Sequence, residues 1–333
     1  MEESIETYQA LDPRGYISTF TSSNTRPSSR PHHTARRTTL LPNVLPRNTY
    51  GSSLTTIGST QVITGITLQI GTPPPNTKTQ GEIDVEVSFS PLCGGQYTAH
   101  GRVQSGKTEG GGVGAGGSST TLSSISYSDP QSMESYIKRT ILHCDVFDLS
   151  QLSVKDGSSA SAWKVIVHCM VVNHDGNVVD ACILGIMTSL KDLSLPPVTT
   201  VPSELNPKEE VVRILPPTNS NSDINEVAES TKRKKRGTSL TFSKMAVPLT
   251  VALFDNKLLV DPTLEEENVS DGMITIVVDL MSVVQDEETN ALNGTILSLA
   301  KSGGGAIISS EEIAACVQLA FGRAKELKSI MNP

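Results

Sequence analysis

The sequence predicts an α/β protein of the α+β type, with mixed, largely antiparallel sheets and a few covering helices. Residues 244–279 contain three successive strand patterns: an alternating run over 247–253, a short apolar run over 258–260 and a β-branched run over 273–278. A β-hairpin is predicted over 51–70, with its turn at Gly58-Ser59. Residues 181–190 are apolar almost all round, which is typical of a buried central helix.

Composition limits the class of protein. With 333 residues and 37% hydrophobic content, the chain can bury one large core or two smaller ones. The net charge of −8 does not favour a free-standing nucleic-acid binder. Five cysteines without a CxxC pair fit reduced thiols, and the acidic N-terminus does not resemble a signal peptide. Because no apolar run reaches the length of a membrane span, we expect a soluble intracellular protein without membrane contact.

Local signals place the remaining elements. Asp129-Pro130 predicts the start of a helix that ends at about Leu142, and residues 163–172 read as a long strand. A capping box over 309–312 predicts a C-terminal helix. His168 and Cys169 are neighbours in the long strand and would point to opposite faces, so no zinc site is predicted there, nor any other metal or cofactor.

Residues 1–50 are predicted to form an N-terminal arm, partly flexible and basic, with one short turn of helix near residues 16–20. Guanidinium groups match phosphate oxygens, so its arginines suit RNA contacts, although an ordinary basic linker explains them equally well. The candidates, together with one arginine farther along the chain, are Arg26, Arg30, Arg36, Arg37 and Arg102.

Two flexible insertions are expected within the remaining domain, residues 51–333: one at about 101–124 and one at about 197–240. Residues 101–108 match the Walker A pattern, but they lack the preceding apolar strand and the following helix that a P-loop needs. The basic run at 232–236 could be a nuclear import signal, an RNA contact or a solvated loop.

Carboxylates crowd the bend between the last two predicted strands: Asp261, Glu265, Glu266, Glu267 and Asp271. Clustered oxygens could hold a hard metal ion or supply a general acid. A solvated acidic loop is the simpler interpretation, and the sequence favours it.

Three stretches carry a resemblance to a known family. They are Leu258 to Glu267 followed by Gly272-Met273, the Gly-Ser-x-Leu hairpin at 51–66, and Pro91-Leu92-Cys93. The chain resembles the ribonuclease PH family, and within it the ring subunits of the eukaryotic RNA exosome. The resemblance implies an RNase PH-like fold over most of the chain.

The resemblance also assigns functional slots. Active members hold the attacking phosphate with a Gly-Thr-Arg triplet, where this chain has Asn177-Val178-Val179, so Val179 stands in the arginine slot. They carry two aspartates on the acidic bend, where this chain has Glu267 and Gly272. A family Arg-Pro-Asp-Gly-Arg motif is matched by residues 26–30, in which Ser28-Ser29 replaces Asp-Gly. The implied catalytic set is therefore degenerate, with no catalytic residue predicted.

A non-catalytic structural subunit is the function that this resemblance implies. The expected partners are other RNase PH-like ring subunits, RNA-binding cap subunits, RNA in the central channel and a separate 3′–5′ exoribonuclease. The expected processes are rRNA maturation and mRNA turnover, in the nucleus, nucleolus and cytoplasm. An active phosphate-dependent exoribonuclease is the alternative, and a P-loop nucleotide-binding protein is the third.

Overall fold

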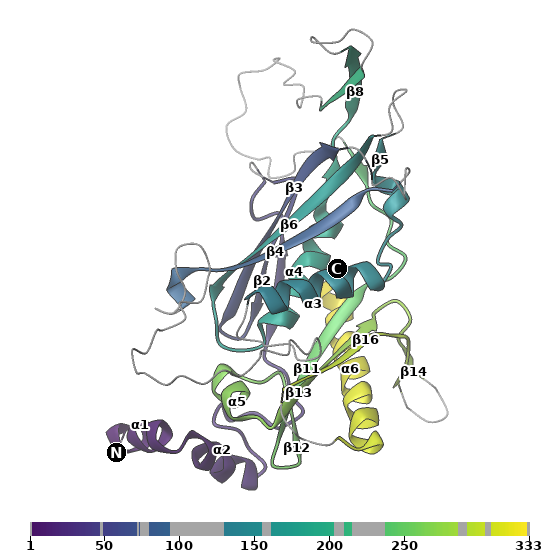
Figure 1. Ribbon diagram of the computed structural model, residues 1–333. Helices are drawn as coiled ribbons and strands as arrows, with labels where there is room; N and C mark the ends of the chain where they lie inside the picture. Colours follow the sequence, from purple (N-terminus) through teal and green to yellow (C-terminus); the bar gives the residue numbers. More distant parts are fainter. Residues whose placement is uncertain are drawn as a thin grey trace, which may run out of the picture.

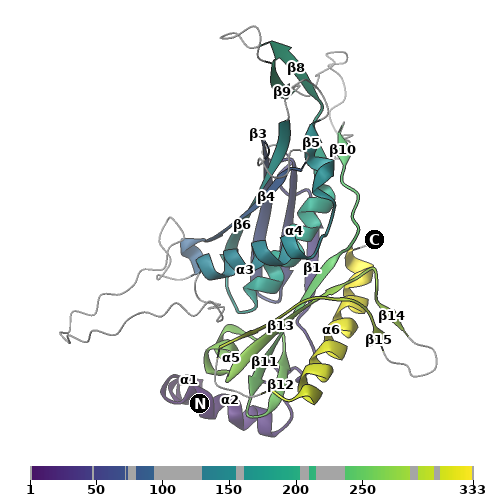
Figure 2. The same ribbon diagram turned by 45° about the vertical axis from the view of Figure 1, so that its right-hand side comes forward.

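The computed structural model describes residues 2–46, 49–71, 73, 80–93, 130–154, 161–202, 210–214, 237–285, 292–303 and 308–331. Two main sheets, both containing antiparallel pairs, are packed with helices, and two further helices lie at the N-terminus (Figures 1 and 2). The predicted fold class, mixed sheets with covering helices, is confirmed. Among the described helices, none is long and apolar enough to cross a membrane.

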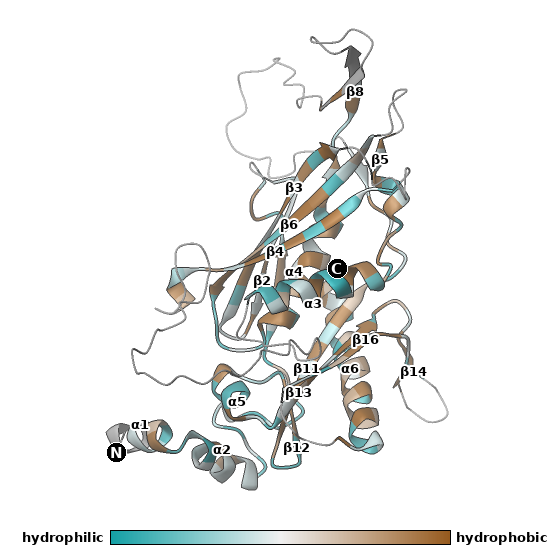
Figure 3. Ribbon diagram, viewed as in Figure 1, coloured by the Kyte–Doolittle hydropathy of each residue, from teal (hydrophilic) through white to brown (hydrophobic). Residues whose placement is uncertain are grey.

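The first sheet has the strand order β1-β2-β3-β6-β4, with β5 paired to β6. Its strands are β1 (Thr38–Pro42), β2 (Gly51–Ile57), β3 (Thr60–Gly71), β4 (Glu82–Phe89), β5 (Ser153–Val154) and β6 (Ser161–Asn173). All of the pairs are antiparallel except β4 with β6. The predicted hairpin turn lies between β2 and β3, where Gly58 adopts a positive φ of 57°. Hydrophobic and hydrophilic residues alternate along β4 and β6, so one face is buried and the other is largely open (Figure 3).

Helix α4 (Val178–Asp192) is the central helix that the sequence predicts, and it contacts β2, β3 and β11. Helix α3 (Pro130–His143) packs beside β4. Its Glu134 carboxylate accepts a hydrogen bond from the Val87 backbone N–H at 3.3 Å, which covers part of the free edge of β4. Short 3-10 turns lie at η1 (Pro91–Cys93) and η2 (Leu149–Leu152).

The second sheet has the order β12-β11-β13-β16 and is antiparallel throughout. Its strands are β11 (Ala246–Phe254), β12 (Lys257–Val260), β13 (Gly272–Asp279) and β16 (Ile296–Ser302). Every residue of β11 and β13 is buried, because α4 and α6 (Ser310–Met331) pack against these central strands. The predicted capping box begins α6, where the Glu312 N–H donates to Ser309 Oγ at 3.2 Å.

The N-terminal segment is more ordered than the sequence suggests. It forms α1 (Glu2–Leu11) and α2 (Pro13–Ser22), where only one turn was expected, and β1 lies within the predicted arm. Ile17 is buried against Phe254 and Leu259 of the second sheet, which anchors α2 there. The Asp-Gly pair of the family motif is replaced, yet a tight turn forms, with the Ser29 N–H donating to Arg26 O at 2.8 Å and Ser29 at a φ of 59°.

Short two-stranded units complete the described chain: β7 (Ser194–Leu195) with β10 (Thr238–Ser239), β8 (Val198–Pro202) with β9 (Glu210–Ile214), and β14 (Val284–Gln285) with β15 (Leu292–Asn293). Strands β8 and β9 therefore fall within the second predicted insertion. The predictions for residues 101–124 and for the basic run at 232–236 lie outside the described residues.

Candidate functional site

Three segments distant in sequence meet at the N-terminus of α4: residues 26–36, the turn at 175–177, and the acidic bend that contains α5 (Leu264–Val269). The expectation of a solvated acidic loop is wrong for Asp261 and Glu266, whereas Glu265 of the same bend is exposed. Asp261 is 1% exposed and Glu266 is 2% exposed. Each of these carboxylates pairs with an arginine that the sequence places far upstream, and those pairs compensate for the loss of hydration.

Arg26 and Glu266 form a fully buried ion pair. The Arg26 Nε donates to Glu266 Oε1 at 2.8 Å, and Nη2 contacts the second carboxylate oxygen. The remaining donors reach the backbone carbonyls of Val260 and Asp261 at 2.6 and 3.1 Å. Burial would raise the pKa of Glu266, but the hydrogen bonds and charge of Arg26 hold that pKa below its ordinary value. Arg26 therefore links the N-terminal segment to the acidic bend of the same chain.

Arg36 makes a second, forked pair with Asp261. Its Nε and Nη2 donate to the two carboxylate oxygens, each at 2.9 Å, and its backbone N–H donates to Oδ2 at 2.7 Å. Its Nη1 donates to the backbone carbonyl of Asp175 at 2.6 Å, so the pair joins the bend to the turn before α4. Burial would raise the pKa of Asp261, but Arg36 and Asn177 hold it below its usual range.

The backbone N–H of Asn177, the residue before α4, faces the acidic bend. Asn177 precedes the helix in a left-handed conformation, at a φ of 55°, and its N–H donates to Glu267 Oε1 at 2.6 Å. Helix N-termini attract anions, so the Glu267 carboxylate occupies an anion position at the slot that the resemblance assigns to phosphate binding. Burial raises the pKa of Glu267 to about 7, against the opposing effects of the Asn177 N–H and Arg36.

Asp180 lies one turn farther into α4 and joins it to the second sheet. Its carboxylate accepts hydrogen bonds from the backbone N–H and the hydroxyl of Thr250, both at 2.8 Å. The Thr250 hydroxyl is also 2.9 Å from that of Thr275. Burial raises the pKa of Asp180 to about 6, so this side chain and Glu267 both favour the protonated state more than free carboxylic acids do.

At the two other positions that the resemblance assigns to catalysis, Val179 has an apolar side chain and Gly272 has no side chain. Val179 is fully buried in the first turn of α4, where it is part of the hydrophobic core and offers no donor. Gly272 begins β13, and a Cβ added there would meet Gly303 O at 3.4 Å, an ordinary contact. The backbone at position 272 would therefore accept a Cβ, and the carboxylate of the family slot is absent because the residue is glycine.

The arginines proposed for RNA contact separate into four groups. Arg26 and Arg36 are buried and paired within the chain, so the expectation of flexible side chains is wrong for them, and RNA contact is not supported there. The Arg30 side chain is 15% exposed, and its Nη1 lies 3.5 Å from Asp261 Oδ2. Arg37 is exposed, and within the described part of the chain its guanidinium forms no ion pair. Arg102 lies outside the described residues.

Metal chemistry finds no support in the part of the chain that the structure describes, where no group of three His, Cys, Asp or Glu side chains could hold an ion. His168 and Cys169 lie on opposite faces of β6, as predicted: Cys169 is buried and His168 is exposed. The His168 ring instead bridges Thr67 and Glu86, each at 2.9 Å.

Comparison with known proteins matches two regions of the chain. Residues 34–196 match domain 1 of the 3′ exoribonuclease family, RNase PH, and residues 244–323 match its domain 2. The chain belongs to this family. Its first domain carries the N-terminus of α4, and its second carries the acidic bend, so the candidate site lies where the two domains of an RNase PH protein meet.

Two relatives are named as exosome components. The chain is 28% identical over 283 residues to "Exosome complex component Rrp42" of Pyrococcus furiosus, covering 84% of this chain and 79% of that protein. It is 25% identical over 280 residues to the protein of that name in Methanosarcina acetivorans, with the same two coverages.

Solved structures share the RNase PH fold. A chain of the "archaeoglobus fulgidus exosome with RNA bound to the active site" aligns with a TM-score of 0.63 at 22% identity, covering 95% of this chain and 96% of that one. Rice Rrp46 aligns with a TM-score of 0.53 at 13% identity, covering 92% and 97%. At these identities the likeness concerns the fold.

Proposed function

We propose that this chain is a non-catalytic subunit of an exosome core ring, where it forms ring interfaces and part of the RNA channel wall. Its similarity to exosome components named Rrp42 and its RNase PH fold support this proposal. The partners would be other RNase PH-like subunits, RNA-binding cap subunits, RNA and a separate 3′–5′ exoribonuclease. The compartments would be the nucleus, nucleolus and cytoplasm, in support of RNA processing and degradation.

One observation carries the non-catalytic part of the proposal. The Glu267 carboxylate lies 2.6 Å from the Asn177 N–H, at the helix end where the family resemblance places the attacking phosphate. A phosphate at that position would have to displace the Glu267 side chain from the Asn177 N–H. The site is therefore closed by one of its own side chains.

Two substitutions remove the groups that phosphorolysis would need. The arginine slot holds buried Val179, which cannot neutralise a phosphate, and the second aspartate slot holds Gly272. Arg36, the nearest buried arginine, is already paired with Asp261. Among the sequence-predicted RNA contacts that are described, exposed Arg37 is the best candidate, because its guanidinium does not have to leave an internal partner.

The test is to purify the tagged full-length chain from its native cells and assay the recovered complex on single-stranded RNA, with and without phosphate. We expect recovery with other RNase PH-like chains. We expect that any phosphate-dependent release of nucleoside diphosphates is unchanged by Glu267→Ala in this chain, since that side chain performs no chemistry.

Glu311→Ala is the matched control, because Glu311 is an exposed glutamate in the first turn of α6. Phosphate-dependent release that disappears with Glu267→Ala and persists with Glu311→Ala would overturn the non-catalytic assignment. Recovery of the chain alone, with no RNase PH-like partner, would overturn the ring assignment.

A further inference from the structure

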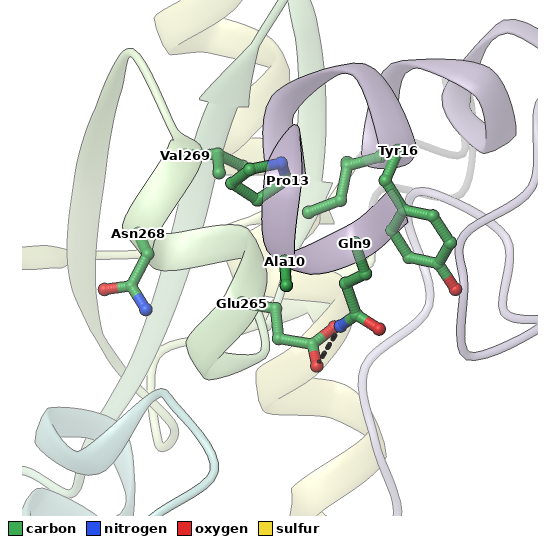
Figure 4. A pocket seen from close by; sticks show the side chains of 8 residues that line it. Gln9, Ala10, Pro13, Tyr16, Glu265, Asn268 and Val269 are labelled. Carbon is green, nitrogen blue, oxygen red and sulfur yellow. Dashed lines mark hydrogen bonds between the residues drawn. The ribbon is translucent and has the colours of Figure 1, made fainter. Parts of the chain in front are cut away.

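A pocket of about 420 Å³ lies between the N-terminal helices and α5. Figure 4 shows it from close by, with α1 and α2 on one side and α5 on the other. The lining residues are Gln9, Ala10, Pro13, Tyr16, Ile17, Glu265, Asn268 and Val269. A volume of this order is large enough to accommodate a large side chain of another molecule.

The walls of this pocket are mainly apolar and its mouth is polar. Ala10 and Pro13 line it from the side of the N-terminal helices and Val269 from the side of α5 (Figure 4). At the rim, Gln9 Nε2 donates to Glu265 Oε1 at 2.6 Å, which holds α1 against α5. This combination of apolar wall and hydrogen-bonding rim is typical of a site that receives an apolar side chain within a polar segment.

Exposed apolar side chains extend the pocket along α1. Leu11 is 80% exposed and Tyr8 is 45% exposed, and they lie three residues apart on one face of the helix. The Tyr8 ring is 6.2 Å from that of Tyr16, a lining residue, in an edge-to-face arrangement. Exposed aromatic and leucine side chains beside a pocket mark a protein-binding surface.

The charges around the pocket indicate which kind of partner this surface would attract. Between residues 7 and 22, the charged residues are Asp12 and Arg14. Arg14 is already paired with Asp255 and Asp271, at 2.8 Å each. The only charged residue that lines the pocket is Glu265. RNA would meet uncompensated negative charge here, whereas lysine or arginine side chains would be attracted.

We infer that the pocket between α1–α2 and α5 docks a segment of another protein that carries a large apolar side chain within two residues of a lysine or arginine. The apolar side chain fills the pocket between Ala10 and Val269. The basic side chain faces Glu265. This site is separate from the degenerate phosphate site and does not depend on it.

Photo-crosslinking of the full-length chain in its native complex tests this inference. The probe is p-benzoylphenylalanine placed at Asn268, an exposed lining residue, with the same probe at exposed Ala315 of α6 as the control. We expect the Asn268 probe, and not the Ala315 probe, to crosslink one protein segment with the stated apolar and basic pair. Crosslinking to RNA, to a segment lacking that pair, or to nothing overturns the inference.

The crosslinked segment is then synthesised and its affinity for the full-length chain measured by fluorescence anisotropy. Ala10→Trp fills the pocket from an exposed position and is expected to weaken binding at least tenfold. Glu265→Lys is expected to weaken it at least threefold, with an effect that shrinks in high salt. Ala315→Trp is the matched control. Equal affinity for wild type and Ala10→Trp contradicts the inference, while recovery of ring subunits in the same purification tests the proposed function separately.

Discussion

Two sets of arginine–carboxylate pairs join the N-terminal segment to the second domain, and they differ in burial. In the inner pair, the Arg26 and Glu266 side chains are 0% and 2% exposed. In the outer set, the Arg14 side chain is 49% exposed and reaches Asp255 and Asp271, which are 43% and 34% exposed. The same chemistry therefore has two consequences. The inner pair makes the junction dependent on each partner, whereas water can replace either partner of the outer set.

The largest expected effect is at the inner pair. Arg26→Ala leaves the Glu266 carboxylate buried without its partner, and we expect the free energy of unfolding to fall by about 3–5 kcal/mol. Urea denaturation followed by circular dichroism measures it. Because this variant could unfold outright, the double variant Arg26→Met, Glu266→Leu is the control. It should regain most of the loss, since it removes both charges together. A double variant less stable than Arg26→Ala would contradict the assignment of the loss to an unpaired charge.

A smaller, pH-dependent effect is expected at Glu267. Its pKa in the folded chain is about 7, above the ordinary value of 4.5, so the folded state keeps a proton that the unfolded state loses. The contribution of Glu267 to stability is therefore largest below pH 4.5 and decreases as the pH rises to about 7. Glu267→Gln keeps an acceptor for the Asn177 N–H and removes this titration.

We expect Glu267→Gln to be more stable than wild type at pH 8, on the order of 2 kcal/mol, and the difference to shrink towards pH 5. Urea denaturation at both pH values measures it. Asp180, whose pKa is also raised, titrates in both proteins, and its charge contributes to the raised pKa of Glu267, so the difference reports Glu267 together with this coupling. Exposed Glu265→Gln should show no such trend, and a constant difference from pH 5 to 8 would contradict the burial of the Glu267 carboxylate.

The smallest effect is expected at the outer set. Arg14→Ala should lower the free energy of unfolding by no more than about 1 kcal/mol, because its ion pairs are solvated. This loss includes the contact between the guanidinium and the Phe254 ring, whose centre lies 5.1 Å away. The measurement is urea denaturation at 0.1 and 1 M NaCl. The loss should shrink in high salt, whereas the loss caused by Arg26→Ala should not. Equal salt sensitivity of the two variants would remove the distinction between inner and outer pairs.

Periodicity made the sheets predictable. The alternating and β-branched runs over 247–278 became β11, β12 and β13, and Gly58 supplied the left-handed turn that its position indicated. The two N-terminal helices were harder to predict, because they contain few strongly apolar residues and only Ile17 and Thr21 of α2 are buried. Strand β1 was not predicted, because it lies in a mainly polar arm and its pairing partner, β2, follows only after a loop.

The sequence predicted where the candidate site lies, but not which of its side chains are buried and paired. Val179, Glu267 and Gly272 were assigned by the family resemblance; Val179 belongs to the first domain, and Glu267 of the second domain reaches the N-terminus of α4. The burial of Asp261 could not be found, because its partner Arg36 is 225 residues away and nothing local indicates the pair. An ion pair between distant residues contributes nothing to the net charge of the chain. Considered separately, the acidic bend and the basic arm therefore each indicated a solvated segment.

The closure of the inner pair also sets an order of events during synthesis. Arg26 and Glu266 are separated by 240 residues, with the whole first domain between them. At roughly 5–20 residues per second, the N-terminal segment emerges from the ribosome on the order of 10–50 s before its carboxylate partner. Throughout that interval the guanidinium groups of Arg26 and Arg36 are without their native partners, and Ile17 lacks its apolar cover. The nascent chain is therefore most open to chaperones at its first residues until its second domain has been made.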